Sequence, residues 1–201
     1  MNNKNIPNIL TGFRIIIIPV LIASFYIEGQ MYHWVAAGLF LLASVTDFFD
    51  GYLARTLKAT SNLGRFLDPI ADKLLVASAI LMLVHFDDIG RYDIIPAVAI
   101  LCREILVSGL REFLAEINVS VPVSNLSKIK TAVQMTAIFL LLLGVEGPSF
   151  DEVEAITETN MTEFLGRILL WVSAILTLIT GYAYLKSGLK HMTESDAKSK
   201  N

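Results

Sequence analysis

Residues 47–72 read DFFDGYLARTLKATSNLGRFLDPIAD and place four aspartates between two long apolar runs. On a helix of about 3.6 residues per turn, positions 47, 50, 51, 54 and 55 share one face, and positions 64, 68 and 72 share another. The short connection between them, residues 56–63, lets the two faces meet across a tight helix pair. The pattern therefore predicts that four carboxylates converge on one point, those of Asp47, Asp50, Asp68 and Asp72.

Four converging carboxylates need a compensating positive charge. Hard divalent cations with oxygen ligands are the natural partners, because so much uncompensated charge beside an apolar environment is strongly destabilising. Two such ions about 4 Å apart clamp the attacking and leaving oxygens in phosphoryl transfer. Gly51 and Ala54 leave space for a substrate near the backbone, and Arg55 offers a planar fork to phosphate oxygens. A nucleotide diphosphate would fit such a site.

The composition around this stretch is that of a membrane protein. Of the 201 residues, 54% are hydrophobic and 17% are charged, with a mean hydropathy of +0.60. Six apolar stretches each approach the roughly 20 residues that a helix needs to cross the hydrocarbon core. They lie at about 9–27, 34–56, 66–86, 93–114, 130–146 and 164–186. We expect one all-α integral membrane domain over residues 1–201, a bundle of six transmembrane helices. The net charge of −3 gives no indication of a nucleic-acid partner.

Basic residues concentrate on one side of the expected bundle, which the positive-inside rule assigns to the cytoplasm. They are Lys4, Arg14, Arg55, Lys58, Arg65, Lys73, Arg103, Arg111, Lys128, Lys130, Lys186, Lys190, Lys198 and Lys200. Arg91 and Arg167 lie on the other side, together with Glu28 and the acidic loop 147–163. Both termini and the four aspartates are therefore predicted to face the cytoplasm, with the chain crossing the inner membrane several times.

Polar residues at helical spacing interrupt the cytoplasmic halves of the apolar stretches. Hydrocarbon tolerates such residues only where they face a cavity lined by protein. They are Asn8, Thr11 and Arg14 in the first stretch, Arg103, Glu104, Ser108, Arg111 and Glu112 in the fourth, and Lys130 and Gln134 in the fifth. They predict a polar vestibule that opens to the cytoplasm and is closed on the other side by apolar helix halves.

The stretch 47–72 resembles the signature of the CDP-alcohol phosphatidyltransferase family. The match covers eight positions, Asp47, Asp50, Gly51, Ala54, Arg55, Gly64, Asp68 and Asp72. The resemblance implies a six-helix, usually dimeric membrane fold with two divalent cations, Mg²⁺ or Mn²⁺. It implies that Asp47 and Asp68 bridge the two ions, while Asp50 and Asp72 each bind one. The residues expected to bind the CDP-lipid are Asn8, Thr11, Gly51, Ala54, Arg55, Ser61 and Gly64.

The same resemblance implies a reaction with CDP-diacylglycerol. We expect the oxygen of an acceptor alcohol to attack in line the phosphorus that carries diacylglycerol, with CMP as the leaving group. Asp72 is the candidate general base for the alcohol. Because a neighbouring cation lowers the basicity of a carboxylate, the alternative is that Asp72 only orients the hydroxyl.

Further cations in the vestibule bear on the identity of the acceptor. Arg103, Arg111, Lys128 and Lys130 favour an anionic acceptor over a neutral polyol or choline. Glycerol 3-phosphate fits best, because residues 5–14, 103–112 and 128–134 also resemble the bacterial branch of the family that makes phosphatidylglycerophosphate. Inositol phosphate is the alternative acceptor, since the same cations could hold its phosphate.

Other interpretations of these residues stay open at this point. Lys58 and Lys73 could anchor helix ends at anionic headgroups. Arg103 and Arg111 could form purely structural ion pairs with Glu104 or Glu112. An intramembrane prenyltransferase also pairs aspartate motifs with magnesium, but it would lack the glycine and arginine register of residues 51–64. A transporter would need carboxylates that are accessible from both faces, whereas the outer helix halves carry no matching polar stripe.

Overall fold

In the computed structural model of the chain, the described residues form helices and the turns next to them. It describes residues 6–57, 62–117, 119, 124–144 and 161–199. Within those ranges there is no strand, and the helices are α1 (Ile6–Ser24), α2 (Met31–Leu57), α3 (Asn62–His85), the 3₁₀ helix η2 (Arg91–Asp93), α4 (Ile94–Glu116), α5 (Asn125–Leu143) and α6 (Met161–Ser199). The predicted all-α fold with six long helices is confirmed.

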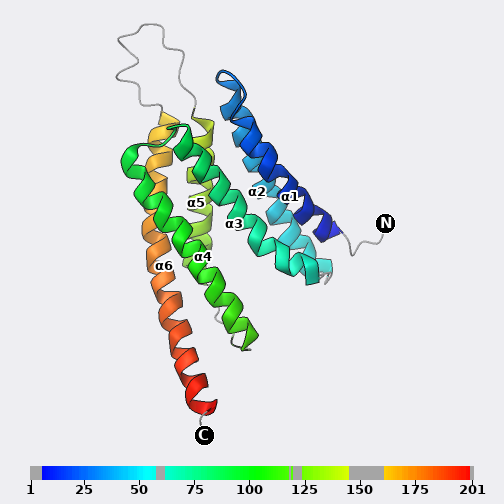
Figure 1. Cartoon of the computed structure of the whole chain (residues 1–201), viewed down its shortest axis with the longest axis vertical. Coiled ribbons are helices and arrows are strands. Elements are labelled where there is room, and N and C mark those ends of the chain that lie inside the picture. The colour runs from blue at the N-terminus through cyan, green and yellow to red at the C-terminus, as the bar shows by residue number, and fades with distance from the viewer. Residues whose placement is uncertain (1–5, 58–61, 118, 120–123, 145–160, 200–201) are drawn as a thin grey trace.

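The helices pack in two groups around α3 (Figure 1). α1 packs along α2 and α3, while α6 packs along both α5 and α4, and α2 contacts α5. The core between them is aliphatic and aromatic, with small alanines where helices approach closely. Its most deeply buried members include Leu21, Phe25, Ala36, Phe40, Leu75, Ala79, Leu83, Ile138, Leu141 and Leu170. This core fixes the rotation of each helix and thereby the direction of its polar side chains.

The helix bounds follow the predicted stretches closely in α1 to α4 and depart from them in α5 and α6. α5 begins at Asn125 rather than near 130, because the hydroxyl oxygen of Ser124 accepts a hydrogen bond from the backbone N–H of Ser127 and caps the helix. α6 continues to Ser199 rather than ending near 186. Hydropathy predicts where a helix leaves the hydrocarbon core of the membrane. The helix can continue beyond that point if the following residues have sufficient helix propensity. Most of the predicted acidic loop 147–163 lies outside the described residues.

The outer surface of the bundle is apolar. Large hydrophobic side chains are exposed on every long helix, among them Ile16, Leu41, Leu81, Val98, Ile105, Ile129, Ile175 and Leu178. Among the described residues, two helices are long and apolar enough to cross a membrane by length and composition alone, Asn125–Leu143 and Met161–Leu189, with mean hydropathies of 1.5 and 1.9. In α2, α3 and α4, charged residues in the half nearest the site lower the mean hydropathy of the helix. An apolar surface of this extent indicates a lipid environment.

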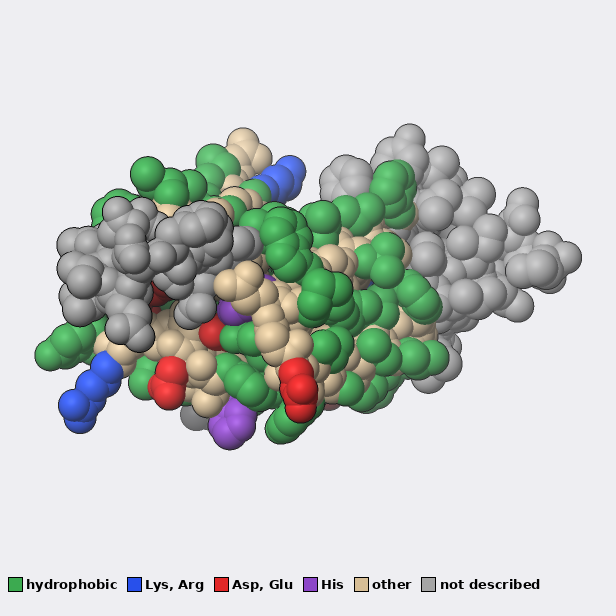
Figure 2. All heavy atoms as spheres, turned by 90° about the horizontal axis from the view of Figure 1, so that it is seen from above, with side chains coloured by type: hydrophobic (Ala, Val, Ile, Leu, Met, Phe, Trp, Pro, Cys, Tyr) green, Lys and Arg blue, Asp and Glu red, His purple; other side chains and the backbone are tan. Residues whose placement is uncertain are grey.

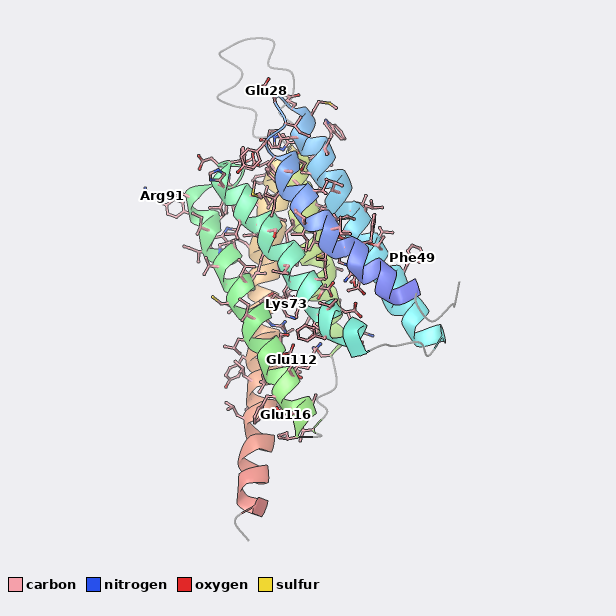
Figure 3. All side chains as sticks on the ribbon, turned by 45° about the vertical axis from the view of Figure 1, so that its right-hand side comes forward. Glu28, Phe49, Lys73, Arg91, Glu112 and Glu116 are labelled. Carbon is pink, nitrogen blue, oxygen red and sulfur yellow. The ribbon has the colours of Figure 1, made fainter. Side chains whose placement is uncertain are left out.

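The two ends of the bundle differ in character. One end carries the α1–α2 turn and η2, where the labelled Glu28 and Arg91 lie in Figure 3. Figure 2 looks down on this end and shows mainly hydrophobic side chains with few charged ones among the described residues. The other end holds the start of α1, the end of α2, the start of α3 and the end of α4. The polar residues predicted to form the vestibule lie at this second end.

Candidate active site

Two helices supply the described carboxylates of the site. Asp47 lies near the end of α2, while Asp68 and Asp72 are one turn apart near the start of α3. The side chains of Asp47 and Asp72 are 47% and 48% exposed, so solutes can reach them. The structure thus places three of the four predicted ligands at one end of the bundle, on two neighbouring helices.

The first helix places a cation between these carboxylates. Arg14 has a fully buried side chain, with its Nη2 atom 2.7 Å from Oδ1 of Asp47 and its Nη1 atom 2.5 Å from Oδ1 of Asp72. One turn earlier on α1, the hydroxyl of Thr11 donates to Oδ1 of Asp68. A buried arginine needs such partners, since an isolated buried charge is strongly disfavoured. α1 therefore holds the carboxylates of α2 and α3 in fixed positions.

A second polar cluster joins α4, α5 and α6. The ammonium group of Lys130, whose side chain is 3% exposed, donates to Oε1 of Glu104. The Nη1 atom of Arg103 lies 3.5 Å from the same oxygen, and its Nη2 atom donates to the hydroxyl of Thr180 at 3.1 Å. Two of the four predicted acceptor-binding cations are thereby brought together. Glu104 pairs with both of them, as the structural interpretation of Arg103 allowed.

The described contacts leave the other two predicted cations outside this cluster. Arg111 is exposed, with its guanidinium carbon 5.7 Å from the centroid of the Tyr184 ring on α6. Lys128 is exposed in the first turn of α5. Both lie at the vestibule end of their helices.

Lys73 connects the two clusters electrostatically. It follows Asp72 on α3, and its ammonium donates to the carbonyl oxygen of Pro69 at 2.6 Å. The charges of Glu104, Glu112 and Asp72 all act on this ammonium, and Figure 3 shows Lys73 on α3 beside the half of α4 that carries Glu112. Lys73 is partly buried on α3, and its role, at the site or as a headgroup anchor, stays a prediction. Lys58 lies outside the described residues.

Comparison with known proteins decides the family. A sequence model of the CDP-alcohol phosphatidyltransferase family matches residues 4–179, which include the charged residues of both clusters, while Thr180 lies one residue beyond the match. The chain belongs to this family. The resemblance inferred from residues 47–72 is thereby confirmed, and the choice between transferase, prenyltransferase and transporter falls on the transferase.

Curated relatives of this phosphatidyltransferase cover nearly its whole length. A protein of Rickettsia felis is 48% identical over 189 residues, which span 94% of this chain and 98% of the relative. Proteins of Rickettsia prowazekii and Cereibacter sphaeroides are 49% and 37% identical, covering 92% and 96% of this chain. All three relatives are named CDP-diacylglycerol–glycerol-3-phosphate 3-phosphatidyltransferase.

Several residues of the family signature fall where the structure gives no side-chain detail. Asp50, Gly51, Ala54 and Arg55 belong to α2 and Asn8 to α1, but their side chains lie outside the described part, as does Ser61 entirely. Gly64 is buried near the start of α3. Their predicted roles at the CDP-lipid and metal sites therefore stay predictions.

The donor set of this phosphatidyltransferase fits a divalent cation in chemistry and access. Asp47, Asp68 and Asp72 offer only carboxylate oxygens, which Mg²⁺ and Mn²⁺ prefer, and the side chains of Asp47 and Asp72 are about half exposed. Among residues with described side chains, no three acidic, histidine or cysteine groups surround a common point that could hold a metal ion. The guanidinium of Arg14 lies between two of the carboxylates instead.

The structure also reveals residues that sequence reasoning missed. Thr180 and Gly181 on α6 contact Arg103, and Tyr184 lies beneath Arg111. Single threonine, glycine and tyrosine residues in an apolar stretch give no functional signal by themselves. The available signal was their spacing, because positions 177, 180, 181 and 184 share one helix face.

Proposed function

We propose that this enzyme transfers the phosphatidyl group of CDP-diacylglycerol to glycerol 3-phosphate, giving phosphatidylglycerophosphate and CMP. The observation that carries the proposal is the presence of two polar centres at one end of the bundle. One consists of carboxylates on α2 and α3, and the other contains the partly buried Arg103 and the buried Lys130. The names of the relatives support glycerol 3-phosphate as the acceptor.

The carboxylate centre suits the CDP-lipid. Asp47, Asp50, Asp68 and Asp72 would hold two divalent cations, Mg²⁺ or Mn²⁺. When bound, such ions stabilise negative charge on the diphosphate and on the departing CMP. Arg14 and Thr11 hold the carboxylates in place through Oδ1 contacts. The CDP-lipid would contact Asn8, Thr11, Gly51, Ala54, Arg55, Ser61 and Gly64.

The second centre suits the acceptor. Arg103 and Lys130 would bind the phosphate of glycerol 3-phosphate, because charge-assisted hydrogen bonds from a guanidinium and an ammonium recognise phosphate strongly. Arg111 and Lys128 are more exposed and would attract the anion towards the vestibule. Inositol phosphate carries the same group and is the alternative acceptor.

The transfer itself needs one proton acceptor. The free hydroxyl of the acceptor forms a new O–P bond to the phosphatidyl phosphorus, and the P–O bond to CMP breaks. Asp72 would accept this proton, or would only orient the hydroxyl; its carboxylate is half exposed and is held by Arg14, which supports either role.

The surroundings of the enzyme follow from the charge distribution. The site end carries the basic residues Arg14, Lys73, Arg103, Arg111 and Lys130, which favours the cytoplasmic side of the inner membrane for the site and for both termini. Lipid would contact the apolar outer faces of the helices. The family resemblance favours a homodimer, in which part of this apolar surface would face the second copy.

Release of CMP tests the proposed function. Purified protein in detergent is given CDP-diacylglycerol and Mg²⁺ with glycerol 3-phosphate, inositol phosphate, inositol or serine. We expect CMP with glycerol 3-phosphate alone, none after addition of EDTA, and none in Asp68→Asn. Asp87→Asn is the matched control, because Asp87 is an exposed aspartate at the opposite end.

The possible outcomes separate the parts of the proposal. Release with another alcohol would retain the transferase and reject the acceptor. Undiminished release in EDTA would reject the metal requirement. No release with any acceptor, from protein that unfolds cooperatively, would reject the proposed reaction.

A further inference from the structure

The side chain of Arg103 is held from behind by α6. Its Nη2 atom donates to the hydroxyl oxygen of Thr180 at 3.1 Å. Its aliphatic stem lies against the backbone of Gly181, where an added Cβ would be 2.9 Å from Cγ and 3.4 Å from Nε of Arg103. Consecutive residues of one helix thus provide a hydrogen-bond acceptor and a gap of matching size for a single arginine.

The hydroxyl of Thr180 donates within its own helix. It is buried at 5% exposure, with the carbonyl oxygens of Leu176 at 2.8 Å and Thr177 at 3.2 Å as acceptors. With its hydrogen used inside the helix, the oxygen is left to accept from Arg103. This arrangement sets the rotation of the guanidinium rather than allowing it to turn about its long stem.

The placement of Arg103 carries a free-energy cost, and packing alone does not explain why the fold accepts it. Its Nε atom is buried and has no hydrogen-bond partner among the described residues. A buried donor without a partner is destabilising, and such groups are rare outside sites where geometry serves a function. The guanidinium has five N–H donors, and its contacts with Thr180 and Glu104 leave several uncommitted.

We propose that Thr180 and Gly181 are positioning residues for the acceptor, a phosphomonoester of a small polyol, because they aim the guanidinium of Arg103 at its phosphate. This assignment rests on the proposed function. It extends the acceptor site to α6 and adds two uncharged residues that never touch the substrate. Gly181 admits the arginine stem, Thr180 fixes the rotation, and Lys130 supplies the second cation from α5.

Thr180 variants test the hydrogen bond. Thr180→Val keeps the shape and removes the hydroxyl, so we expect KM for glycerol 3-phosphate to rise about tenfold, the usual effect of losing a hydrogen bond to a charged group. The kcat and the KM for CDP-diacylglycerol should stay at wild-type values. Thr180→Ser should restore the acceptor KM. Thr177→Val is the matched control, because the Thr177 hydroxyl is buried one turn earlier without a partner among the described residues.

Glycine variants test the gap by a second route. In Gly181→Ala the new Cβ pushes the stem of Arg103, so the acceptor KM should rise by a similar factor of about ten. Gly188→Ala is the matched control two turns further along α6. Its Cβ would lie 2.9 Å from Cδ2 of Leu110, so it creates the same crowding between α4 and α6 without touching a charge. We expect Gly188→Ala to lower thermal stability and to leave the acceptor KM unchanged.

Calorimetric binding of glycerol 3-phosphate to the purified, full-length protein separates this inference from the proposed function. If the wild type releases no CMP, the proposed reaction fails, and the effect of Thr180→Val on binding still tests the positioning role. Binding that is weakened in Thr180→Val and restored in Thr180→Ser supports the inference. Equal affinity in the wild type and Thr180→Val, equal effects of Gly181→Ala and Gly188→Ala on acceptor KM, or no binding to the wild type would overturn it.

Discussion

The Nη1 atom of Arg14 lies 2.5 Å from Oδ1 of Asp72. The same guanidinium reaches Asp47, so a single buried side chain of α1 joins a carboxylate of α2 to one of α3. Together with the hydrogen bond from Thr11 to Asp68, this contact holds the three helices together where the site is built. Arg14 supplies part of the positive charge that the sequence pattern required.

Removing the Arg14 charge should make stability depend on divalent cations. In Arg14→Gln two carboxylates lose their partner, and we expect a loss of about 2–3 kcal/mol in EDTA, below the full value for a buried pair because both carboxylates are half exposed. Mg²⁺ should restore part of the loss. Thermal unfolding in detergent measures both effects. Arg91→Gln is the control, since Arg91 is exposed in η2. An unchanged Tm in EDTA would contradict the structural role of Arg14, and a loss that Mg²⁺ does not reduce would contradict the metal site.

Lys130 and Lys128 should differ sharply in their effect on the acceptor. The Lys130 side chain is 3% exposed and binds Glu104, whereas Lys128 is exposed. Lys130→Gln should raise KM for glycerol 3-phosphate at least about tenfold, and Lys128→Gln about twofold or less, because exposed charges are screened by solvent. Steady-state kinetics at fixed CDP-diacylglycerol measures both. Equal effects of the two changes would show that burial of the cation does not matter.

Asp93 should contribute to stability without affecting the reaction. It is 2% exposed at the opposite end of the bundle, where it accepts hydrogen bonds from Nε of Arg167 at 2.6 Å and Nε1 of Trp171 at 2.8 Å. Asp93→Asn should cost about 2 kcal/mol, since it leaves Arg167 without its closest charge partner. Glu163→Gln is the comparison, because Glu163 meets the same arginine at 3.7 Å in a partly exposed pair worth well under about 1 kcal/mol. Substrate KM values should be the same in both variants, and a changed KM in Asp93→Asn would contradict the separation of the two ends.

Gly166 should resist substitution where Gly109 does not. A Cβ at Gly166 would lie 2.9 Å from Cγ and 3.2 Å from the backbone nitrogen of Leu141, so α5 and α6 would have to move apart. Gly166→Ala should lower stability by about 1–3 kcal/mol, as overpacking does. Gly109→Ala meets nothing within 4 Å and should be neutral or stabilise α4, because alanine favours helices. Thermal unfolding of the two variants checks this, and the reverse order would contradict the packing of α5 against α6.

Asp88 should make stability fall as the pH rises. It lies between α3 and η2, where burial raises the pKa of its carboxyl above the ordinary value and the Tyr32 hydroxyl donates to Oδ1 at 3.1 Å. Below the unfolded pKa both states are protonated and nothing is lost, whereas at higher pH the folded state must bury a charge. Asp88→Asn should flatten the dependence of Tm on pH, while Asp87→Asn, at an exposed residue, should not. An unchanged pH profile in Asp88→Asn would contradict this assignment.

The sequence predicted the helices, and the placement of Asp47, Asp68 and Asp72 at one end of the bundle, because both rest on spacing along the chain. Asp68 and Asp72 had to share a face, and the apolar stretches had to be helices in a membrane. Contacts between distant segments could not be predicted from spacing. Arg167 was placed on the outer side without a partner, and the structure pairs it with Asp93. Such pairs depend on how each helix is rotated, which is decided by the packing of the whole core.

The contacts of Thr180 and Gly181 with Arg103 also could not be predicted from the sequence. Thr180 and Gly181 are unremarkable in a sequence, since threonine and glycine are common in membrane helices. Only the approach of α4 reveals that they hold Arg103. Nothing in the sequence ranked the four acceptor cations. The structure separates the buried Lys130 and the partly buried Arg103 from two exposed residues.

The length of α6 offers a practical handle. With 39 residues it extends about 58 Å, nearly twice the roughly 30 Å of a bilayer core, and in Figure 1 it runs past the ends of its neighbours. A tag fused to the end of α6 as a continuous helix would keep a fixed orientation relative to the protein, whereas a flexible linker would not. Such a fusion would provide a fiducial for orienting images of a small enzyme that has little mass outside its detergent belt.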